Sequence, residues 1–415
     1  MSLLFCTGFD ELPDATYPDD TSGMWLANVV DLSTMFYFFN PAMFTLPGCA
    51  GRLAAGYKGG KCLKLVLSWL NQEEEEYLDT SLASDPSVWA VHESDTLIVG
   101  FHYKADSIVA YCPENGTYTS EGPRNRNIVR MIGNNQEVCL LEVFINQQGR
   151  ICVYRDGSMG GVMVSDVVFV PGRWYHFELK TVGGEHGSWE LRINGTTLLS
   201  ETDVDMRYND YYTCPRAIGF TSYWDQAHYY DNLYMMDGEG TAFNDFLGPT
   251  RISASRPAGD STTNEWLRML NYEEDVDPSD HYTYVDETQY EWGFPFPDSR
   301  LVQTDVPGAI ELFTYGASVS EFDAIHGVVV TPYGWEDLDW NEEEGVSYGP
   351  GIQGVVAEDA ATVASEASYF SDHGFNGEAP IFFVFPEKPG GGAWSATDFD
   401  GEAHSLAFGF QMATE

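Results

Sequence analysis

The stretch GFTSYWDQAHYYDNLYMMDGEGTAFNDFLGP, residues 219–249, carries the strongest structural signals in this chain. Polar and apolar side chains alternate along residues 230–236, which predicts a β-strand with one solvated and one buried face. The DGEG that follows predicts a turn at the end of this strand. We expect this strand to be the last of its domain.

Four shorter motifs surround this strand in a fixed order. WYHFELK at residues 174–180 and ELRING at 190–195 precede DNLY at 231–234, and NDFLG at 244–248 and the Arg-Pro pair at 256–257 follow. The series resembles the concanavalin-like (laminin-G-like) jelly rolls of structural proteins of tailed bacteriophages. Those proteins read W-x-H-h-E-h-K, h-x-h-N-G and D-[DN]-h-Y before N-D-F-L-G and R-P.

Both ends of the chain carry the same resemblance. LLFCTGFD at residues 3–10 is similar to the first strand of such jelly rolls, so we expect it to pair with residues 229–236. AWSATDF at 393–399 and LAFGF at 406–410 look like the ending of the same phage proteins. The resemblance implies an all-β chain, with a concanavalin-like jelly-roll sandwich followed by a second, smaller β-sandwich domain.

Length and composition point the same way. The chain has 415 residues, more than the roughly 250 to 300 at which a single core stops growing, so two domains are expected. Its 41 glycines and 14% aromatic residues favour many short strands joined by tight turns. We expect a jelly roll over residues 1–249, an irregular aromatic and acidic connecting segment over 250–308, and a small β-sandwich over 309–415.

Turn residues delimit the other strands. Two packed sheets would bury large apolar side chains from strands of both. One short helix fits residues 357–367. We expect strands at residues 61–65, 97–103, 138–146, 150–155, 162–170, 174–180, 309–313, 325–331 and 381–385, and burial of Phe144, Val153, Trp174, Phe177, Trp189 and Ile193.

The formal charge of −44 limits the partners. It repels phosphate backbones and anionic lipids, so we expect neither nucleic acid nor a membrane as partner. The four glutamates at 73–76 predict a solvated loop or short helix rather than a cation site. The apolar run at 35–39 is too short to cross a bilayer, and the first 30 residues lack the pattern of a signal peptide.

The seven cysteines form neither a CxxC pair nor a zinc-type cluster with histidine. Buried free thiols in a protein made in a reducing cytoplasm are expected, although pairing in the fold stays open. They are Cys6, Cys49, Cys62, Cys112, Cys139, Cys152 and Cys214.

Sites for chemistry are scarce. Glycosidases of the concanavalin-like fold place paired carboxylates on one strand as E-h-D-x-x-E, and the nearest match here is Glu321 and Asp323, with His326 in place of the second glutamate. No nucleophile elbow, zinc-protease, P-loop or dinucleotide motif is present. We therefore expect no enzyme and no cofactor, and assign no catalytic or cofactor-binding residue.

Two kinds of ligand stay open without assigned residues. Calcium would suit the hard oxygens of Asp203, Asp205, Asn209, Asp210 and Asp225. The histidines stand singly, so His92, His102 and His228 are expected to be satisfied strand or loop residues rather than switches. Glycan-stacking candidates, most of them expected in the core or at subunit interfaces, are Trp25, Trp69, Trp89, Tyr208, Tyr211, Tyr212, Tyr223 and Trp224.

The leading hypothesis is a non-enzymatic structural component of a tailed-virus virion, in the capsid decoration, tail or baseplate, assembled in many copies in the host cytoplasm. Aromatic side chains at short intervals in the connecting segment, such as Trp266 and Trp292, favour docking onto a neighbouring subunit over a free linker. The partners would be further copies of the chain and other virion proteins. The alternatives are a host-surface glycan-binding adhesin and a glycoside hydrolase of the same fold.

Overall fold

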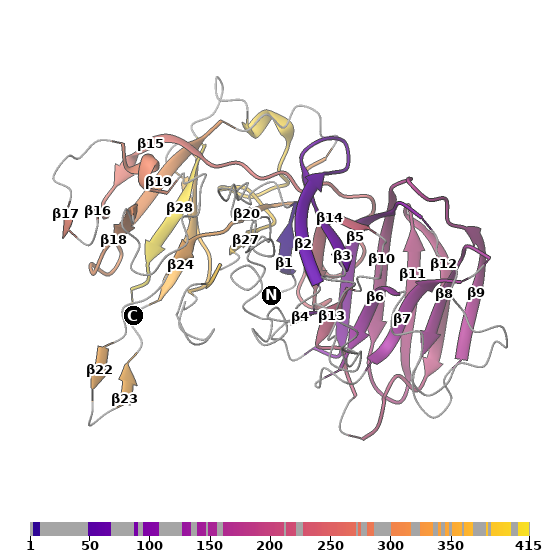
Figure 1. Ribbon diagram of the computed structural model, residues 1–415. Coiled ribbons are helices and arrows are strands. Elements are labelled where there is room, and N and C mark those ends of the chain that lie inside the picture. The colour runs from indigo at the N-terminus through magenta and orange to yellow at the C-terminus, as the bar shows by residue number, and fades with distance from the viewer. Residues whose placement is uncertain are drawn as a thin grey trace, which may run out of the picture. The chain divides into compact units, whose positions relative to one another are not determined.

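The computed structural model describes residues 3–8, 49–67, 87–89, 94–107, 127–133, 139–146, 148–155, 161–210, 213–220, 227–270, 273–274, 280–285, 300–316, 324–334, 339–341, 345–347, 351–358, 361–367, 379–380, 383–399 and 406–414. Regular structure is almost entirely β-strand, which confirms the expected all-β class. The chain folds as two compact units, with the main boundary between Ser253 and Ala254 (Figure 1). Within the described residues, none of the helices has the length and apolar character needed to cross a membrane.

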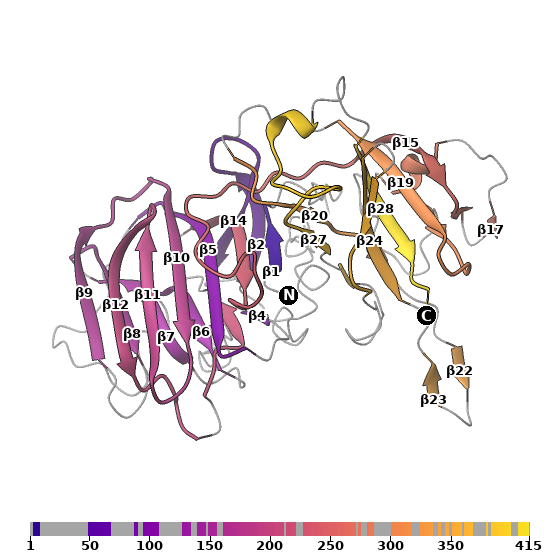
Figure 2. The same cartoon turned by 180° about the vertical axis from the view of Figure 1, so that it is seen from behind.

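Unit 1 is a sandwich of two antiparallel sheets, which lie face to face in Figures 1 and 2. The larger sheet contains β1 (Leu3–Thr7), β2 (Cys49–Ala55), β3 (Lys61–Leu67), β5 (Thr96–Ala105), β10 (Tyr175–Val182), β11 (Gly187–Ile193), β12 (Thr196–Val204) and β14 (His228–Met236). Its order is β12-β11-β10-β5-β14-β3-β2, with β1 also paired to β14. The smaller sheet contains β4 (Ser87–Trp89), β6 (Asn127–Ile132), β7 (Cys139–Ile145), β8 (Arg150–Arg155), β9 (Gly161–Val168) and β13 (Ala217–Gly219), in the order β4-β13-β6-β7-β8-β9.

Aromatic side chains fill the space between these sheets. Phe101 of β5 stacks on Phe177 of β10, with ring centroids 5.8 Å apart, and both are fully buried. The Tyr230 ring of β14 packs against Phe220, which follows β13, at 4.4 Å. Its hydroxyl donates to the carbonyl of Ile128 in β6, at 2.8 Å. Because alternate residues of a strand point to opposite faces, these contacts define the inner face of the larger sheet.

The strand expectations for unit 1 are largely confirmed. β1 pairs with β14, as expected from the resemblance, with Leu3 opposite Met236. Five of the six expected core side chains are buried, namely Phe144, Val153, Phe177, Trp189 and Ile193. The expected burial of Trp174 is wrong, because this side chain is only half-buried and lies on the outer face of the larger sheet.

The expectation that one face of β14 is exposed to solvent is also wrong. All nine residues of this strand are buried. A bulge interrupts its pairing with β5 between Asp231 and Tyr234, and Asn232 has a φ of 51° there. Residues 245–252 cover the outer face at this point, so polar residues of the alternating pattern are enclosed rather than solvated. The following turn is as predicted, with the Asp237 carboxylate accepting from the Glu239 N–H at 2.9 Å.

Unit 2 is built around a five-stranded antiparallel sheet, in the order β15-β19-β28-β24-β25. These strands are β15 (Pro257–Asn264), β19 (Ile310–Tyr315), β28 (Leu406–Met412), β24 (Ile352–Glu358) and β25 (Ala361–Ala364). A three-stranded sheet joins β17 (Glu273–Glu274), β16 (Leu267–Leu270) and β18 (Arg300–Gln303). Two-stranded pairs join β20 (Val328–Val330) to β27 (Phe383–Phe385), β21 (Tyr333–Gly334) to β26 (Ala379–Pro380), and β22 (Asp339–Asn341) to β23 (Gly345–Ser347); short 3-10 helices are η3 (His281–Tyr284) and η5 (Ala396–Phe399).

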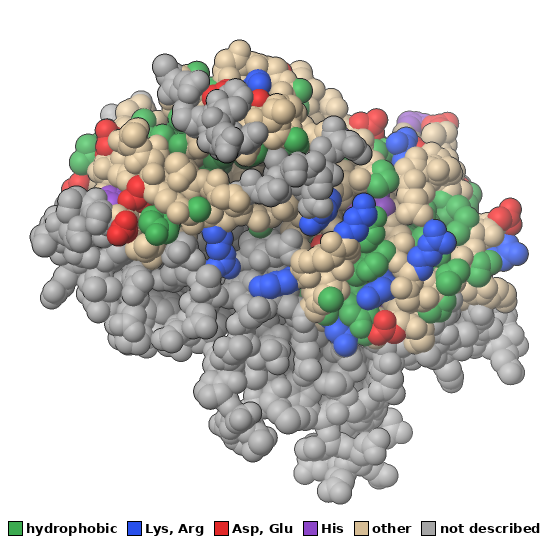
Figure 3. Space-filling view, turned by 90° about the horizontal axis from the view of Figure 1, so that it is seen from above, with side chains coloured by type: hydrophobic (Ala, Val, Ile, Leu, Met, Phe, Trp, Pro, Cys, Tyr) green, Lys and Arg blue, Asp and Glu red, His purple; other side chains and the backbone are tan. Residues whose placement is uncertain are grey.

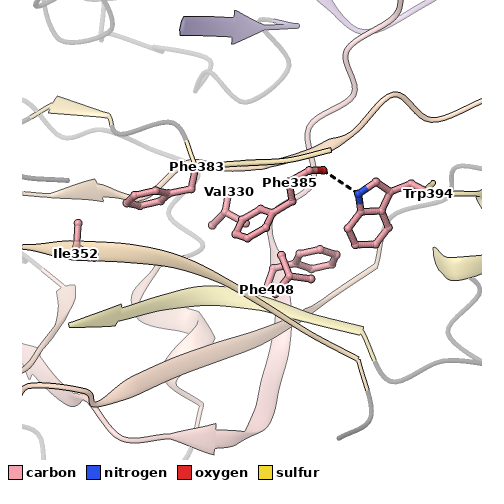
Figure 4. Close-up of a cluster of buried hydrophobic side chains, with 7 residues drawn as sticks. Val330, Ile352, Phe383, Phe385, Trp394 and Phe408 are labelled. Carbon is pink, nitrogen blue, oxygen red and sulfur yellow. Dashed lines mark hydrogen bonds between the residues drawn. The ribbon is translucent and has the colours of Figure 1, made fainter. Parts of the chain in front are cut away.

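The main core of unit 2 lies between its sheet and the β20–β27 pair (Figure 4). Phe383 and Phe385 of β27 meet Phe408 of β28 there. The buried Trp394 indole donates from Nε1 to the Phe385 carbonyl at 2.8 Å. Trp394 and Phe408 belong to the two C-terminal motifs, so this core explains why both motifs need large aromatic residues.

Two expectations for unit 2 are wrong. The segment from 250 to 308 is not irregular in its described part, because it supplies β15 to the main sheet and β16 and β18 to the three-stranded sheet. Trp266 of this segment packs against Phe410 of the same chain at 4.7 Å rather than presenting a free anchor. Residues 357–367 hold no helix in their described part, because β24 and β25 pair there as a hairpin.

The cysteines agree with the expected thiols where they are described. Cys6, Cys62, Cys139, Cys152 and Cys214 are thiols rather than halves of disulfides, and all but Cys6 are buried. Burial raises the pKa of the Cys62 thiol to about 12, which keeps it protonated and unreactive at neutral pH. The side chains of Cys49 and Cys112 and the glutamate run at 73–76 lie outside the described residues.

Candidate functional site on the outer face of the larger sheet

The outer face of the larger sheet brings polar and aromatic side chains together. Strand register places His102 of β5 opposite His176 of β10 on one side and Asp231 of β14 on the other. These three residues alternate with the inward-pointing Phe101, Phe177 and Tyr230, so they occupy the outer face. The face divides into a half-exposed aromatic part and a covered polar part.

Three aromatic rings and three lysines form the first part, in which Tyr57 and Trp174 are half-exposed and Tyr229 is buried. The indole of Trp174 lies 6.2 Å from the ring of Tyr57 and 6.4 Å from the ring of Tyr229, both edge-on. Five segments supply the group: the β2–β3 turn, β3, β5, the residue before β10, and the start of β14. We call it the aromatic–lysine cluster; it comprises Tyr57, Trp174, Tyr229, Lys58, Lys64 and Lys104.

Hydrogen bonds hold two of the rings in place. The Tyr57 N–H donates to Asp231 Oδ2 at 2.6 Å, and the Tyr57 ring stacks on His102 with centroids 4.1 Å apart. The Tyr229 hydroxyl donates to Asp106 Oδ2 at 2.8 Å. Burial and the Asp106 carboxylate together raise the pKa of Tyr229 to about 12. The rings therefore form a fixed surface rather than loose side chains.

The lysine ammonium groups lie against these rings. Lys104 Nζ is 4.0 Å from the centroid of Tyr229 and 4.9 Å from that of Trp174. Lys64 Nζ is 5.5 Å from the Tyr229 centroid, and Lys58 Nζ is 5.3 Å from the Tyr57 centroid. At such distances the ring quadrupole attracts the cation.

Within the described residues, these lysines form no ion pair with an acid. None of the ion pairs found within the described residues involves Lys58, Lys64 or Lys104. The chain has only 20 Lys and Arg against 64 Asp and Glu, so three unpaired lysines on one face are unusual. Figure 3 shows Lys and Arg side chains standing among hydrophobic ones on the part of the surface that belongs to unit 1.

The covered part contains two histidines, a glutamate and a tyrosine. His102 and His176 have ring centroids 4.8 Å apart, and His176 Nδ1 lies 3.9 Å from Glu178 Oε2. Desolvation lowers the pKa of His102 to about 4 and that of His176 to about 3, so both rings are neutral near pH 7. Within the part of the chain that the structure describes, both ring nitrogens of His176 and Oε2 of Glu178 lack a hydrogen-bond partner. The fourth member, Tyr234, donates its hydroxyl to Glu178 Oε1 at 2.6 Å.

The segment 245–252 forms the cover, and we call it the strap. Its Gly248 N–H donates to Glu178 Oε1 at 2.7 Å. Asp245 pairs with Lys180 at 3.2 Å, and the Arg192 guanidinium lies 4.0 Å from the centre of the Phe246 ring. The motifs that carry the phage resemblance thus meet in one network, in which NDFLG is fastened onto HFELK and DNLY.

Two carboxylates on this face are engaged by backbone and hydroxyl donors. Glu178 Oε1 accepts from Tyr234 and Gly248, and the side chain is fully buried. Asp231 accepts the backbone N–H groups of Tyr57 and Asn232. Both therefore serve to hold the fold, and they do not form the open pair that glycoside hydrolysis needs.

The calcium candidates are separated into ion pairs. Asp205 binds the guanidinium of Arg207 at 2.8 Å, and this contact lowers the pKa of Asp205 to about 2. Asp210 lies 3.6 Å from the same guanidinium, and Asp203 pairs with His186 at 2.8 Å. In the described part of the chain, no group of three metal-binding side chains is found. Asp225 lies outside that part.

The other sequence candidates are scattered. His326 is exposed in unit 2, whereas its expected partners Glu321 and Asp323 lie outside the described residues. His228 is buried in β14 and shares a hydrogen bond of 2.9 Å with the Tyr103 hydroxyl, as expected of a strand histidine. Tyr208 is 44% exposed. The side chains of His92, Trp25, Trp69, Trp89, Tyr211, Tyr212, Tyr223 and Trp224 lie outside the described residues.

Sequence reasoning missed the aromatic–lysine cluster. Tyr57 and Tyr229 were not among the candidates, and Trp174 was expected in the core. One signal was present, since Lys64 and Lys104 occupy positions of β3 and β5 whose neighbours point inward, in a chain with few basic residues.

No family model matches the chain, and no curated protein matches it. Solved structures do match over about half of it. Endo-β-1,4-glucuronan lyase from the fungus Trichoderma reesei is 14% identical, with a TM-score of 0.34, over 49% of this chain and 91% of that one. Domain 4 of AbnA, an extracellular arabinanase from Geobacillus stearothermophilus, was solved in complex with arabinotriose. It is 16% identical, with a TM-score of 0.29, over 56% of this chain and 91% of that one. A carbohydrate esterase of Shiga toxin-encoding bacteriophage phi24B is 10% identical, with a TM-score of 0.29, over 46% and 88%.

These neighbours correct the expectation that the chain is not an enzyme. Two of the three are named as enzymes, a lyase and an esterase, and the third is a domain of an arabinanase. At such low identities the likeness concerns the fold alone and assigns no reaction to this chain. The expected structural role in a virion gains no support from these neighbours.

Proposed function

We propose that this chain is a carbohydrate-binding protein whose jelly roll holds a glycan against the outer face of its larger sheet. The observation that carries the proposal is the aromatic–lysine cluster, in which three fixed rings lie together and the Trp174 and Tyr57 side chains are half-exposed. Aromatic rings fixed in this way offer apolar faces at low entropic cost, and nearby polar groups can orient a bound sugar.

The setting that we propose is the surface of a tailed-virus particle, where the chain would grip host polysaccharide as an adhesin in several copies. The ordered motifs support this setting, because the structure joins Glu178, Tyr234 and Gly248 in one network rather than leaving them as unrelated matches. Copies assembled with other virion proteins would each present one cluster, so weak single-site binding would be strengthened by multivalency.

Binding of the full chain to a glycan array tests the function. We expect a restricted set of glycans to bind, and we expect Trp174→Ala to weaken that binding at least about tenfold, since it removes the central ring. Tyr208→Ala, at an exposed aromatic residue outside the cluster, is the matched control and should bind as the unaltered chain does. If the array stays blank, or if Trp174→Ala binds normally, the proposed function is wrong.

The same glycans should be assayed for cleavage. New reducing ends, unsaturated ends or released acyl groups would show that the chain also acts on what it binds. The assay needs the full chain, because the strap that covers Glu178 precedes the start of unit 2 by only a few residues.

A further inference from the structure

We propose that the glycan bound at the aromatic–lysine cluster is an acidic polysaccharide, with its anionic groups held by Lys58, Lys64 and Lys104. This inference rests on the proposed function and adds the class of ligand. It follows from charge, from geometry and from the way in which the acids of the same face are used.

Charge supplies the first argument. The chain carries a formal charge of −44, yet the three ammonium groups of the cluster have no carboxylate partner within the described residues. Elsewhere on the same sheet, Lys180 pairs with Asp245 and Arg192 pairs with Glu190. Unpaired cations in so acidic a protein are the groups best suited to receive an external anion.

Geometry supplies the second argument. Lys104 Nζ lies 4.9 Å from the centroid of the half-exposed Trp174 ring and 4.0 Å from that of the buried Tyr229 ring, so the ammonium group stands beside the ring on which a sugar would stack. Lys64 lies on the other neighbour strand of Tyr229, and Lys58 lies beside Tyr57. A sugar on these rings would have a cation at its edge, where an acidic substituent projects.

The acidic side chains of this face offset the positive charge of the three lysines only in part. Asp231 is buried and accepts two backbone N–H groups. Glu178 is fully buried beneath the strap. Asp106 is exposed, but its carboxylate accepts the Tyr229 hydroxyl. Two of these acids are therefore buried on the outer face, and the exposed one helps to fix a ring of the cluster.

Long-range repulsion by the rest of the chain does not cancel this local attraction. Charges farther away than the Debye length, about 8 Å at physiological ionic strength, are largely screened. The lysines would act on a bound anion at contact distance, where the attraction between opposite charges is strongest. Nucleic acid is a poorer candidate than an acidic glycan, because its dense phosphate backbone would meet the acidic surface well beyond the cluster.

The test titrates the full chain with three polyuronates, polygalacturonate, alginate and hyaluronate, each beside its carboxyl-reduced neutral form. Dextran sulfate beside dextran tests sulfate as the anionic group, and duplex DNA tests charge alone. We expect at least one acidic polymer to bind at least about tenfold more tightly than its neutral form, and the pair that does so identifies carboxylate or sulfate.

The outcomes separate this inference from the proposed function. Equal binding of acidic and neutral forms, or binding of neutral polymers alone, would overturn the acidic class and leave carbohydrate binding intact. If DNA binds as tightly as the acidic polysaccharides, the cluster attracts any polyanion through charge alone, and the inference is also overturned. If every polymer and every arrayed glycan fails to bind, both proposals fall together.

Variants locate the binding on the cluster. Lys104→Met keeps the aliphatic stem and removes the charge, so we expect the preference for the acidic form to fall about fivefold at low salt. Lys180→Met, on the same sheet but outside the cluster, is the matched control and should keep the preference. If Lys104→Met does not fold, Lys58→Met in the exposed turn serves instead. A preference unchanged in both lysine variants would overturn the assignment.

Discussion

The hydroxyl of Tyr234 donates to Glu178 Oε1 at 2.6 Å, and this bond joins β14 to β10 across Gly100 of β5. The same oxygen accepts the Gly248 N–H, so a single carboxylate fastens two strands and the strap. A buried carboxyl group that loses a hydrogen-bond donor costs the fold stability, because water cannot replace the donor. The network therefore forms a structural centre for unit 1 beside the proposed binding surface.

Removal of this hydroxyl should destabilise unit 1. We expect Tyr234→Phe to lower the free energy of unfolding by about 1.5–3 kcal/mol, because the buried Glu178 would lose a donor that water cannot replace. Denaturant unfolding measures the change. Tyr208→Phe is the control, since Tyr208 is exposed and lies outside this network, and it should change stability by less than about 0.5 kcal/mol. If Tyr234→Phe is as stable as the unaltered chain, the Tyr234 hydroxyl contributes nothing to the stability of unit 1.

Gly100 should be intolerant of any side chain. A Cβ built there would overlap the ring of Tyr234, which crosses directly over this residue. We expect Gly100→Ala to cost about 3 kcal/mol or more, because the ring is held by Glu178 and cannot move away. Gly161→Ala is the matched control, since a Cβ at Gly161 of β9 meets nothing within 4 Å. Thermal unfolding that shows equal losses for both variants would contradict this account.

Much of the fold of unit 1 could be predicted from the sequence, because its motifs report local contacts. Alternation in β10 places Phe177 inside and His176 and Glu178 outside. Trp174 has the same parity as His176 and Glu178, so alternation alone would have placed it outside. Its size suggested the core instead, and that is why the site was missed.

Other features depend on contacts between distant segments. The solvated face expected for β14 is covered by the strap, and nothing in residues 230–236 shows this. The residues around Ala361 have helical propensity, but pairing with β24 holds them as a strand. Tyr57 reaches His102 only because the β2–β3 turn brings it back over the sheet, with Lys58 at a φ of 54°.

Acid should weaken unit 1 through its neutral histidines. The pKa of His102 is about 4 and that of His176 about 3 in the fold, both below the ordinary value of 6.5, because burial disfavours the charged ring. Between those values and 6.5 the unfolded chain binds more protons, so stability falls as pH drops through this window. Each histidine contributes at most about 1.4 kcal/mol per pH unit.

Unfolding measured between pH 7 and pH 4 checks this slope. His176→Gln keeps a polar side chain of similar length and removes the titration, so we expect a flatter curve than for the unaltered chain. His186→Gln is the control, because His186 is exposed on the surface. A slope that is unchanged in His176→Gln would mean that His176 is not the group that binds protons on unfolding.

The stability of unit 2 should fall as pH rises, which is the opposite of the dependence expected for unit 1. Burial raises the pKa of Glu311 to about 8, although it accepts the Trp266 N–H at 3.0 Å, and its Oε1 lies 2.7 Å from His281 Nδ1. The folded state then holds a proton that the unfolded state releases near pH 4.5, so stability falls as pH rises from about 4.5 to 8.

Glu311→Gln mimics the protonated form, so the stability of unit 2 in this variant should depend less on pH over this range. A control at Glu265, whose carboxylate bonds the Ile310 N–H at an exposed position, should keep the slope. If Glu311→Gln leaves the slope unchanged, Glu311 is not the group that holds the proton in the fold, and this prediction is wrong.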